Sequence, residues 1–248
     1  MQDYISAIND TEALNLRASH QMLECFRAYD VRGVIGKTID EHASHRIGYA
    51  AGIVMKAKSA IVGYDARATS SKFANSIALG LNEAGVDVIE IGLCGTEEVY
   101  AATVEFKADV GLMVTASHNP INYNGIKIIG PLARPLEVDS EFSKIASIAR
   151  APLPIAPHKS KLGKRRSASM EARAIYLEKL IEIVKPNNLP AIRVGVDCGH
   201  GAVGPTLMAL SIKLKSKGSK IEIIAYNSEP DPKFPAGIPN PMRRDQNE

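Results

Sequence analysis

Apolar residues in the first half of the chain alternate between a helical spacing and short unbroken runs. The helical spacing is clearest where Phe73, Ile77 and Leu81 repeat every four residues until Gly85 ends the pattern. The predicted helices are 39–57, the segment around Ile77 and 97–106, and the predicted strands are 60–64, 86–91 and 110–114. Helices that alternate with short apolar strands predict an α/β fold, with layered α/β/α domains around mixed, largely parallel sheets.

A second α/β unit is predicted in the last third of the chain. Apolar stripes mark two helices there, and Pro186 ends the first of them. These helices are predicted at 176–184 and 203–214, and two strands at 192–196 and 221–225. One strand–helix–strand unit leaves the edges of its sheet exposed. We therefore expect one domain at 1–155 and a second domain, incomplete at its carboxyl end, at 156–248.

The segment 131–169 differs from both units because it is rich in proline and then in basic residues. Its prolines are Pro131, Pro135, Pro152, Pro154 and Pro157, and its basic run is Lys159, Lys161, Lys164, Arg165 and Arg166. This composition predicts a linker or a domain edge. A nucleic-acid patch is the alternative, but the run has no interleaved aromatic residues.

Composition is ordinary for a soluble globular protein, with 45% hydrophobic and 23% charged residues. The formal charge of +3 gives no support to a nucleic-acid or anionic-membrane partner. No apolar run approaches the roughly 18 residues that span a bilayer. Residues 1–14 lack the basic and apolar regions of a secretory signal, so we expect a cytoplasmic protein.

The three cysteines, Cys25, Cys94 and Cys198, are odd in number and widely spaced. This pattern favours reduced, buried thiols over a disulfide framework or a metal site.

The segment 114–120 carries the clearest chemical signal. It follows the predicted strand 110–114 and places a hydroxyl nucleophile, Ser117, beside His118 and Asn119. Loops at the carboxyl ends of strands in open α/β sheets are where ligands bind. A serine hydrolase would instead need a Gly-x-Ser-x-Gly elbow and a distant His. From these residues alone, a purely structural loop serine stays an equal alternative.

Several motifs in the same order resemble the α-D-phosphohexomutase superfamily. Residues 26–33 read Phe-Arg-Ala-Tyr-Asp-Val-Arg-Gly, 115–120 read Thr-Ala-Ser-His-Asn-Pro, and 123–127 read Tyr-Asn-Gly-Ile-Lys. Residues 95–100 and 227–241 look most like bacterial phosphomannomutases, which supply GDP-mannose for surface polysaccharides. The likeness runs from about Cys25 to Pro241. It implies an isomerase that converts mannose 6-phosphate to mannose 1-phosphate through a phosphoserine and a bisphosphorylated hexose.

The resemblance also implies roles for single residues. Ser117 would carry the phosphoryl group and, through that phosphate, bind Mg²⁺ together with three aspartates of an Asp-Gly-Asp-Gly-Asp-Arg loop. Arg32 and Lys127 match residues that stabilise charge and move protons. His118 and Asn119 would orient the phosphate, and Tyr29 would lie beside the hexose phosphate.

The chain departs from the family pattern at its carboxyl end. No Asp-x-Asp-x-Asp cluster occurs, and the parts of the family's four-domain fold that select the sugar and bind its phosphate are absent. We therefore expect this chain alone to have no appreciable mutase activity, whether its end is natural or cut, and its choice between mannose and glucose stays open.

Two other functions remain as alternatives. One is a non-catalytic remnant that binds phosphate. The other is a dinucleotide-binding module, because residues 199–204 satisfy Gly-x-Gly-x-x-Gly between a strand and a helix. The acid expected about 20 residues further on is poorly matched by Glu222 or Glu229.

Overall fold

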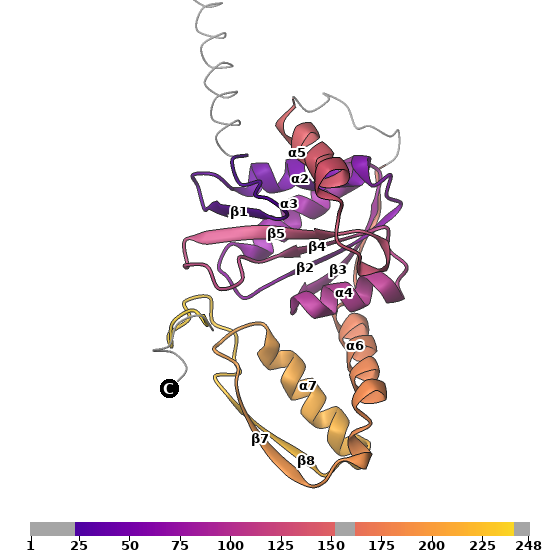
Figure 1. Cartoon of the computed structure of the whole chain (residues 1–248), viewed down its shortest axis with the longest axis vertical. Coiled ribbons are helices and arrows are strands. Elements are labelled where there is room, and N and C mark those ends of the chain that lie inside the picture. Colours follow the sequence, from indigo (N-terminus) through magenta and orange to yellow (C-terminus); the bar gives the residue numbers. More distant parts are fainter. Residues whose placement is uncertain (1–22, 152–161, 241–248) are drawn as a thin grey trace, which may run out of the picture.

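The computed structural model describes residues 23–151 and 162–240, which form two units (Figure 1). Predictions that concern 1–22, 152–161 and 241–248 lie outside these residues. The first unit is a sheet with helices on both faces. The second unit, a smaller assembly of two strands and two helices, lies beyond the helix that covers one face of the first sheet.

The first sheet has six strands in the order β1-β5-β4-β2-β3-β6. Their bounds are β1 (Val31–Val34), β5 (Tyr123–Ile129), β4 (Val110–Val114), β2 (Ser59–Tyr64), β3 (Asp87–Leu93) and β6 (Arg165–Ser167). The four strands from β4 to β6 run parallel, and β5 pairs antiparallel with both β1 and β4. The predicted mixed, largely parallel sheet is confirmed.

Helices cover both faces of this sheet (Figure 1). α2 (Glu41–Val54), α3 (Ser70–Glu83) and α5 (Ser143–Arg150) lie on one face, and α4 (Thr96–Glu105) lies on the other. Asp40 caps the start of α2, and its carboxylate accepts a hydrogen bond of 2.7 Å from the Ala43 N–H. Gly80 allows α2 and α3 to approach closely, because a Cβ at this position would collide with the backbone carbonyl of His45.

The core follows the apolar spacing of the sequence. Phe73, Ile77 and Leu81 are all buried between α3 and the sheet, and every residue of β4 is buried. A central parallel strand is covered on both faces, which explains its unbroken apolar run.

The predicted linker at 131–169 is wrong for most of its described part. It contains two short helical turns, the helix α5 and the strand β6. Pro131 occupies the first position of one turn, where a missing N–H costs nothing. Arg165 belongs to β6 and forms an ion pair with Glu90 of β3, with 2.7 Å between nitrogen and oxygen. This part of the basic run therefore extends the first sheet.

The second unit contains the predicted elements, but its first helix begins at Ser169, well before the predicted start at 176. They are α6 (Ser169–Val184), β7 (Ile192–Asp197), α7 (Val203–Ser216) and β8 (Ile221–Tyr226), and β7 pairs parallel with β8. Apolar side chains such as Ile192 and Ile212 are exposed here. β6 lies beyond residue 155 yet belongs to the first sheet. The division into domains at 1–155 and 156–248 stays a prediction.

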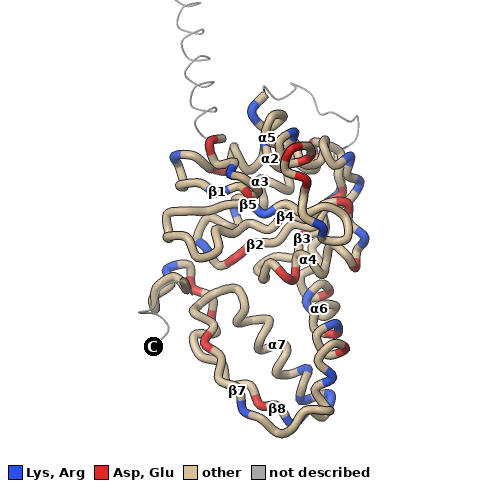
Figure 2. The backbone as a smooth tube through the Cα atoms, in the orientation of Figure 1, with Lys and Arg blue, Asp and Glu red and all other residues tan. Residues whose placement is uncertain are grey.

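Charged residues of both signs are interspersed over both units (Figure 2). Arg166, next along the basic run, pairs with Glu171 and lies over the ring of Phe106. In the part of the chain that the structure describes, no helix is long and apolar enough to cross a bilayer.

All three cysteines are described and buried, and no disulfide joins them. Burial raises the pKa of the Cys25 thiol to about 12 and also raises the pKa of Cys94. The prediction of buried thiols is confirmed.

Candidate active site

The candidate site is built on the loops that follow β2 and β4, two neighbouring parallel strands. Their carboxyl ends meet at one edge of the sheet, so Asp65 and the loop 115–120 lie side by side. The Asp65 N–H donates to the Val114 carbonyl at 3.0 Å, which joins the two loops at their first residues. The sheet topology therefore places the predicted nucleophile at the edge where α/β folds bind ligands.

Ser117 lies at the outer end of its loop in an uncommon backbone conformation. Its φ is 54°, in the left-handed region that few residues other than glycine adopt. Its N–H donates to the Thr115 hydroxyl at 2.9 Å, and its own hydroxyl is exposed. The Ser117 Oγ is 3.4 Å from His118 Nδ1, a contact at the limit of hydrogen bonding. This geometry presents the hydroxyl to solvent.

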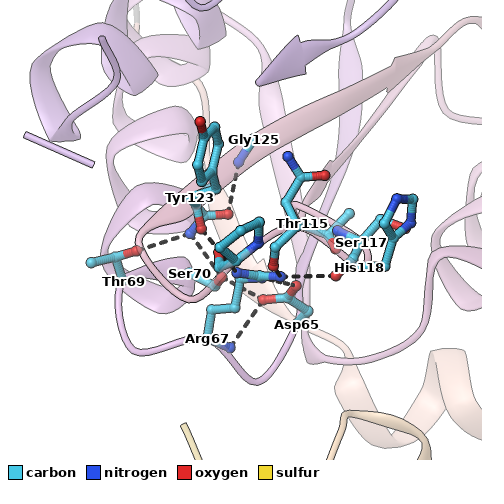
Figure 3. Close-up of polar contacts among 12 residues, drawn as sticks. Asp65, Arg67, Thr69, Ser70, Thr115, Ser117, His118, Tyr123 and Gly125 are labelled. Atoms are coloured by element: carbon cyan, nitrogen blue, oxygen red, sulfur yellow. Dashed lines mark hydrogen bonds and ion pairs between the residues drawn. The ribbon is translucent and has the colours of Figure 1, made fainter. Parts of the chain in front are cut away.

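Arg67 holds the loop 115–120, here called the serine loop, from inside the protein (Figure 3). Its residue exposure is only 4%, and its guanidinium donates to four backbone carbonyls, three in the loop and one at the start of β5. The acceptors are Ser117 at 2.8 Å, Asn119 at 2.6 Å, Pro120 at 2.9 Å and Tyr123 at 3.0 Å. Burial lowers the pKa of Arg67, and the nearby Asp65 carboxylate partly offsets that effect. Arginine stays charged in proteins, so the loop carbonyls surround a fixed cation.

Asp65 and Asn124 complete this buried network. Asp65 Oδ1 accepts from the Ser70 hydroxyl at 2.6 Å and from the Arg67 N–H at 3.0 Å. Asn124, on β5, donates to the hydroxyls of Thr69 at 2.9 Å and Ser70 at 3.0 Å. The beginning of α3 and strand β5 are thereby tied to the serine loop (Figure 3). The sequence analysis singled out none of Asp65, Arg67 and Asn124 for this role.

Arg32 approaches the same loop from β1. One of its terminal nitrogens donates to Asn119 Oδ1 at 2.7 Å, and the other pairs with Asp30 at 2.9 Å. Its Nε is buried and has no hydrogen-bond partner among the described residues. The structure thus brings together two of the predicted site residues, Arg32 and Asn119, two positions beyond Ser117.

Lys127 lies on β5, and Tyr29 lies just before β1. Arg32 pairs with Gly125 across the β1–β5 ladder, and Lys127 lies two residues further along β5, so Arg32 and Lys127 share one face of the sheet. Lys127 is half-buried on that face. Tyr29, just before β1, is 75% exposed. Their roles in catalysis and substrate binding stay predictions.

Comparison with known proteins decides the family. A model of the phosphoglucomutase/phosphomannomutase α/β/α domain I matches residues 23–152, more than half of the chain. The chain belongs to this family.

Relatives and solved structures agree with this assignment. A phosphomannomutase of Salmonella montevideo is 40% identical over 220 residues, which are 89% of this chain and 48% of the relative. A phosphomannomutase of Escherichia coli is 38% identical over 221 residues, with the same shares. A phosphoglucomutase/phosphomannomutase family protein of Burkholderia thailandensis has a TM-score of 0.71 at 27% identity, over 89% of this chain and 47% of that one. The chain spans about half the length of the curated relatives it matches.

The described residues do not fit the Mg²⁺ site that the phosphohexomutase resemblance implies. No group of three or more His, Cys, Asp or Glu side chains within 23–151 and 162–240 is arranged to hold a metal. Asp65 is close to the serine loop, but its oxygens already serve Ser70 and Arg67. A divalent ion that needs about six oxygen ligands would find too few here.

The Gly199 turn has a structural reason in this family member. Gly199 has a φ of 53° and donates to Asp197 at 2.9 Å, which is the main cause of a lowered Asp197 pKa, ahead of the Asn227 hydrogen bond. A Cβ at Gly204 would collide with the Ser228 carbonyl. Glu222, weighed above as the acid of a dinucleotide fingerprint, is paired with Arg193 at 3.3 Å. Turn geometry and close packing account for these glycines.

Proposed function

We propose that this chain provides the phosphoserine site of a phosphohexomutase. Ser117 gives its phosphoryl group to one hydroxyl of a hexose phosphate and recovers a phosphoryl group from the other end of the resulting bisphosphate. The Ser117 Oγ–P bond breaks as a P–O bond to the sugar forms, and the proton of the sugar hydroxyl passes to the released Ser117 oxygen. The second transfer reverses these changes with the sugar turned around.

The position of Arg32 is the observation that carries this proposal. A phosphoserine adds about −1.5 to −2 charges, which need nearby donors. Arg32 is fixed by Asp30 and Asn119, and its buried Nε has no partner in the described part of the chain. Arginine is always protonated, so it stabilises the charge on the transferring phosphoryl group and accepts no proton.

We assign the remaining roles from the same placement. Lys127 shares the sheet face of Arg32 and would carry the proton that leaves the sugar hydroxyl. His118 would bind and orient the phosphate on Ser117, and Tyr29 and Asn119 would border the bound hexose phosphate. Mg²⁺ would bind only with ligands in addition to those that the structure describes.

Mannose 6-phosphate and mannose 1-phosphate are the proposed substrate and product. The support is that relatives with 38–40% identity are phosphomannomutases. The corresponding glucose phosphates are the alternative, because the family model covers phosphoglucomutases too. Supply of mannose 1-phosphate for GDP-mannose, in the cytoplasm, is the cellular role that fits this reaction.

The charge environment of Ser117 can be tested with phosphoserine placed at that position by genetic code expansion. Nearby cations favour the dianion, so the second phosphate pKa, ordinarily about 6, is expected to fall by about one unit. Phosphorus NMR against pH measures it. Arg32→Met should return the pKa toward its ordinary value. Arg134→Met, which removes an exposed cation paired with Glu141, should leave it unchanged. A phosphate pKa unaffected by Arg32→Met would contradict the proposed role of Arg32.

We also expect no sustained turnover by this chain alone. A complete cycle must bind both ends of the sugar and turn the bisphosphate around. The roles we assign to the described residues cover only the part of the site that carries the phosphoryl group. The measurement is a coupled assay with mannose 1-phosphate and a hexose bisphosphate activator. Clear turnover by the pure 248-residue protein would show that the chain needs no further parts.

A further inference from the structure

A buried carboxylate joins the two units of the chain. Glu98 lies in the first turn of α4, and its side chain is 2% exposed. Its Oε1 accepts from the Thr206 hydroxyl at 2.6 Å and from the Gly95 N–H at 3.1 Å. Its Oε2 is 3.4 Å from Nε of Arg173. The carboxylate therefore binds three donors, one at the start of its own helix and two from other helices.

These donors come from both sides of the junction. Gly95 precedes α4 in the first unit, Arg173 belongs to α6, and Thr206 belongs to α7. Arg173 also donates to the Leu93 carbonyl at the end of β3, at 2.8 Å. Figure 1 shows α6 and α7 on the side of α4 that faces away from the first sheet. Glu98 is thus a point at which both helices of the second unit are bonded to the first.

Burial makes this arrangement sensitive to small displacements. A carboxylate removed from water is strongly unfavourable unless donors satisfy it, and the removal of one donor leaves its charge poorly compensated. A shift of the second unit by one or two ångströms would break the bonds to Thr206 and Arg173 together. The network therefore favours one orientation of the two units over slightly different orientations.

We propose that Glu98 is a positioning residue that locks the second unit in one orientation relative to the unit that carries Ser117. Its importance for catalysis rests on the proposed function, but the lock itself does not. A second ion pair between α4 and α6 lies at the surface. Lys179 and Glu105 are 40% and 35% exposed, and exposed pairs contribute little.

Distances between spin labels test the lock directly. Lys144→Cys on α5 and Lys215→Cys on α7 place exposed thiols on the two units, while the native cysteines are buried and resist labelling. Pulsed electron resonance is expected to give one narrow distance distribution. Glu98→Ala should abolish it and give a broad distribution. Glu97→Gln is the matched control, since Glu97 is exposed in the same helical turn. It should leave the narrow distribution intact.

Hydrogen exchange measures the size of the Glu98→Ala effect and separates a positioning role from a role in global stability. Because Glu98→Ala removes hydrogen bonds to a charged group, exchange in α6 and α7 should become about ten- to a hundredfold faster. Exchange in β4 should be unchanged. Equal acceleration in β4 would mean that Glu98 supports only global folding, and the proposal would fail.

Two further variants keep the test decisive. Thr206→Val removes one hydroxyl without a change of shape and should broaden the distances even if Glu98→Ala does not fold. Glu98→Gln keeps an acceptor for Thr206 but loses the charge, so it should retain part of the narrow distribution. A narrow distribution in a folded Glu98→Ala or in Thr206→Val overturns the proposal. Failure of Ser117 to accept phosphate would leave these distances unaffected.

Discussion

Replacing Arg67 with methionine is expected to lower the free energy of unfolding by about 3 kcal/mol or more. The guanidinium is buried and donates to four carbonyls between Ser117 and Tyr123. Methionine fills a similar volume but gives those carbonyls no guanidinium donor, and Asp65 loses its ion pair with the guanidinium. Each buried acceptor without a donor is costly, and removal of one partner exposes that cost in full.

Urea unfolding measures the loss, and hydrogen exchange over 115–124 shows whether it is concentrated in the serine loop. Arg67→Lys keeps the charge but lacks the planar fork of donors, so it should recover only part of the stability. Arg166→Met is the control, because Arg166 is 48% exposed, and its effect should stay within about 0.5 kcal/mol. An Arg67→Met protein as stable as this control would mean that the loop is held by other contacts.

The sequence predicts the fold where burial repeats over short distances. Phe73, Ile77 and Leu81 recur at the helical period because one face of α3 packs on the sheet. The strand predicted at 110–114 coincides with β4, since both of its faces are covered. Such patterns need no knowledge of distant partners.

Strands with polar or exposed residues were not predicted. β5 contains Asn124, Gly125 and Lys127 and was given no secondary structure, yet it pairs with β1 and β4. Asn124 is buried because its amide binds hydroxyls at the start of α3. β6 has three exposed residues and is held by β3 and by the pairing of Arg165 with Glu90. These contacts join residues far apart in the chain, so local patterns do not show them.

The residues of the site also divide into those that the sequence predicted and those that it did not. The nearness of Arg32 to the serine loop followed from motifs of the family rather than from spacing. Arg67 was missed because arginine is rarely buried, so composition suggests a surface residue. A signal was present, since Asp65 and Arg67 directly follow the predicted strand 60–64. That strand ends at the same sheet edge as the strand before Ser117, and loops at that edge meet.

Ser117→Ala is expected to abolish acceptance of a phosphoryl group and leave the fold intact. Alanine has no oxygen with which to form the P–O bond. The Ser117 side chain is exposed and its contact with His118 is long, so the free energy of unfolding should change by less than about 1 kcal/mol. Chemistry and stability are thus separated at this position, unlike at Arg67. Ser147→Ala, which removes an exposed hydroxyl on α5, is the matched control and should keep full acceptance.

Peptide mapping after incubation with mannose 1,6-bisphosphate and Mg²⁺ is the most direct measurement of the central claim. Acceptance of one group needs only a donor and a positioned hydroxyl, so it is expected to be slow but detectable without turnover. We predict the mass of one phosphoryl group on the peptide that contains Ser117, present in Ser147→Ala and absent from Ser117→Ala. A phosphoryl group found only on another residue, or none after prolonged incubation, would contradict the assignment of Ser117 as the phosphate carrier.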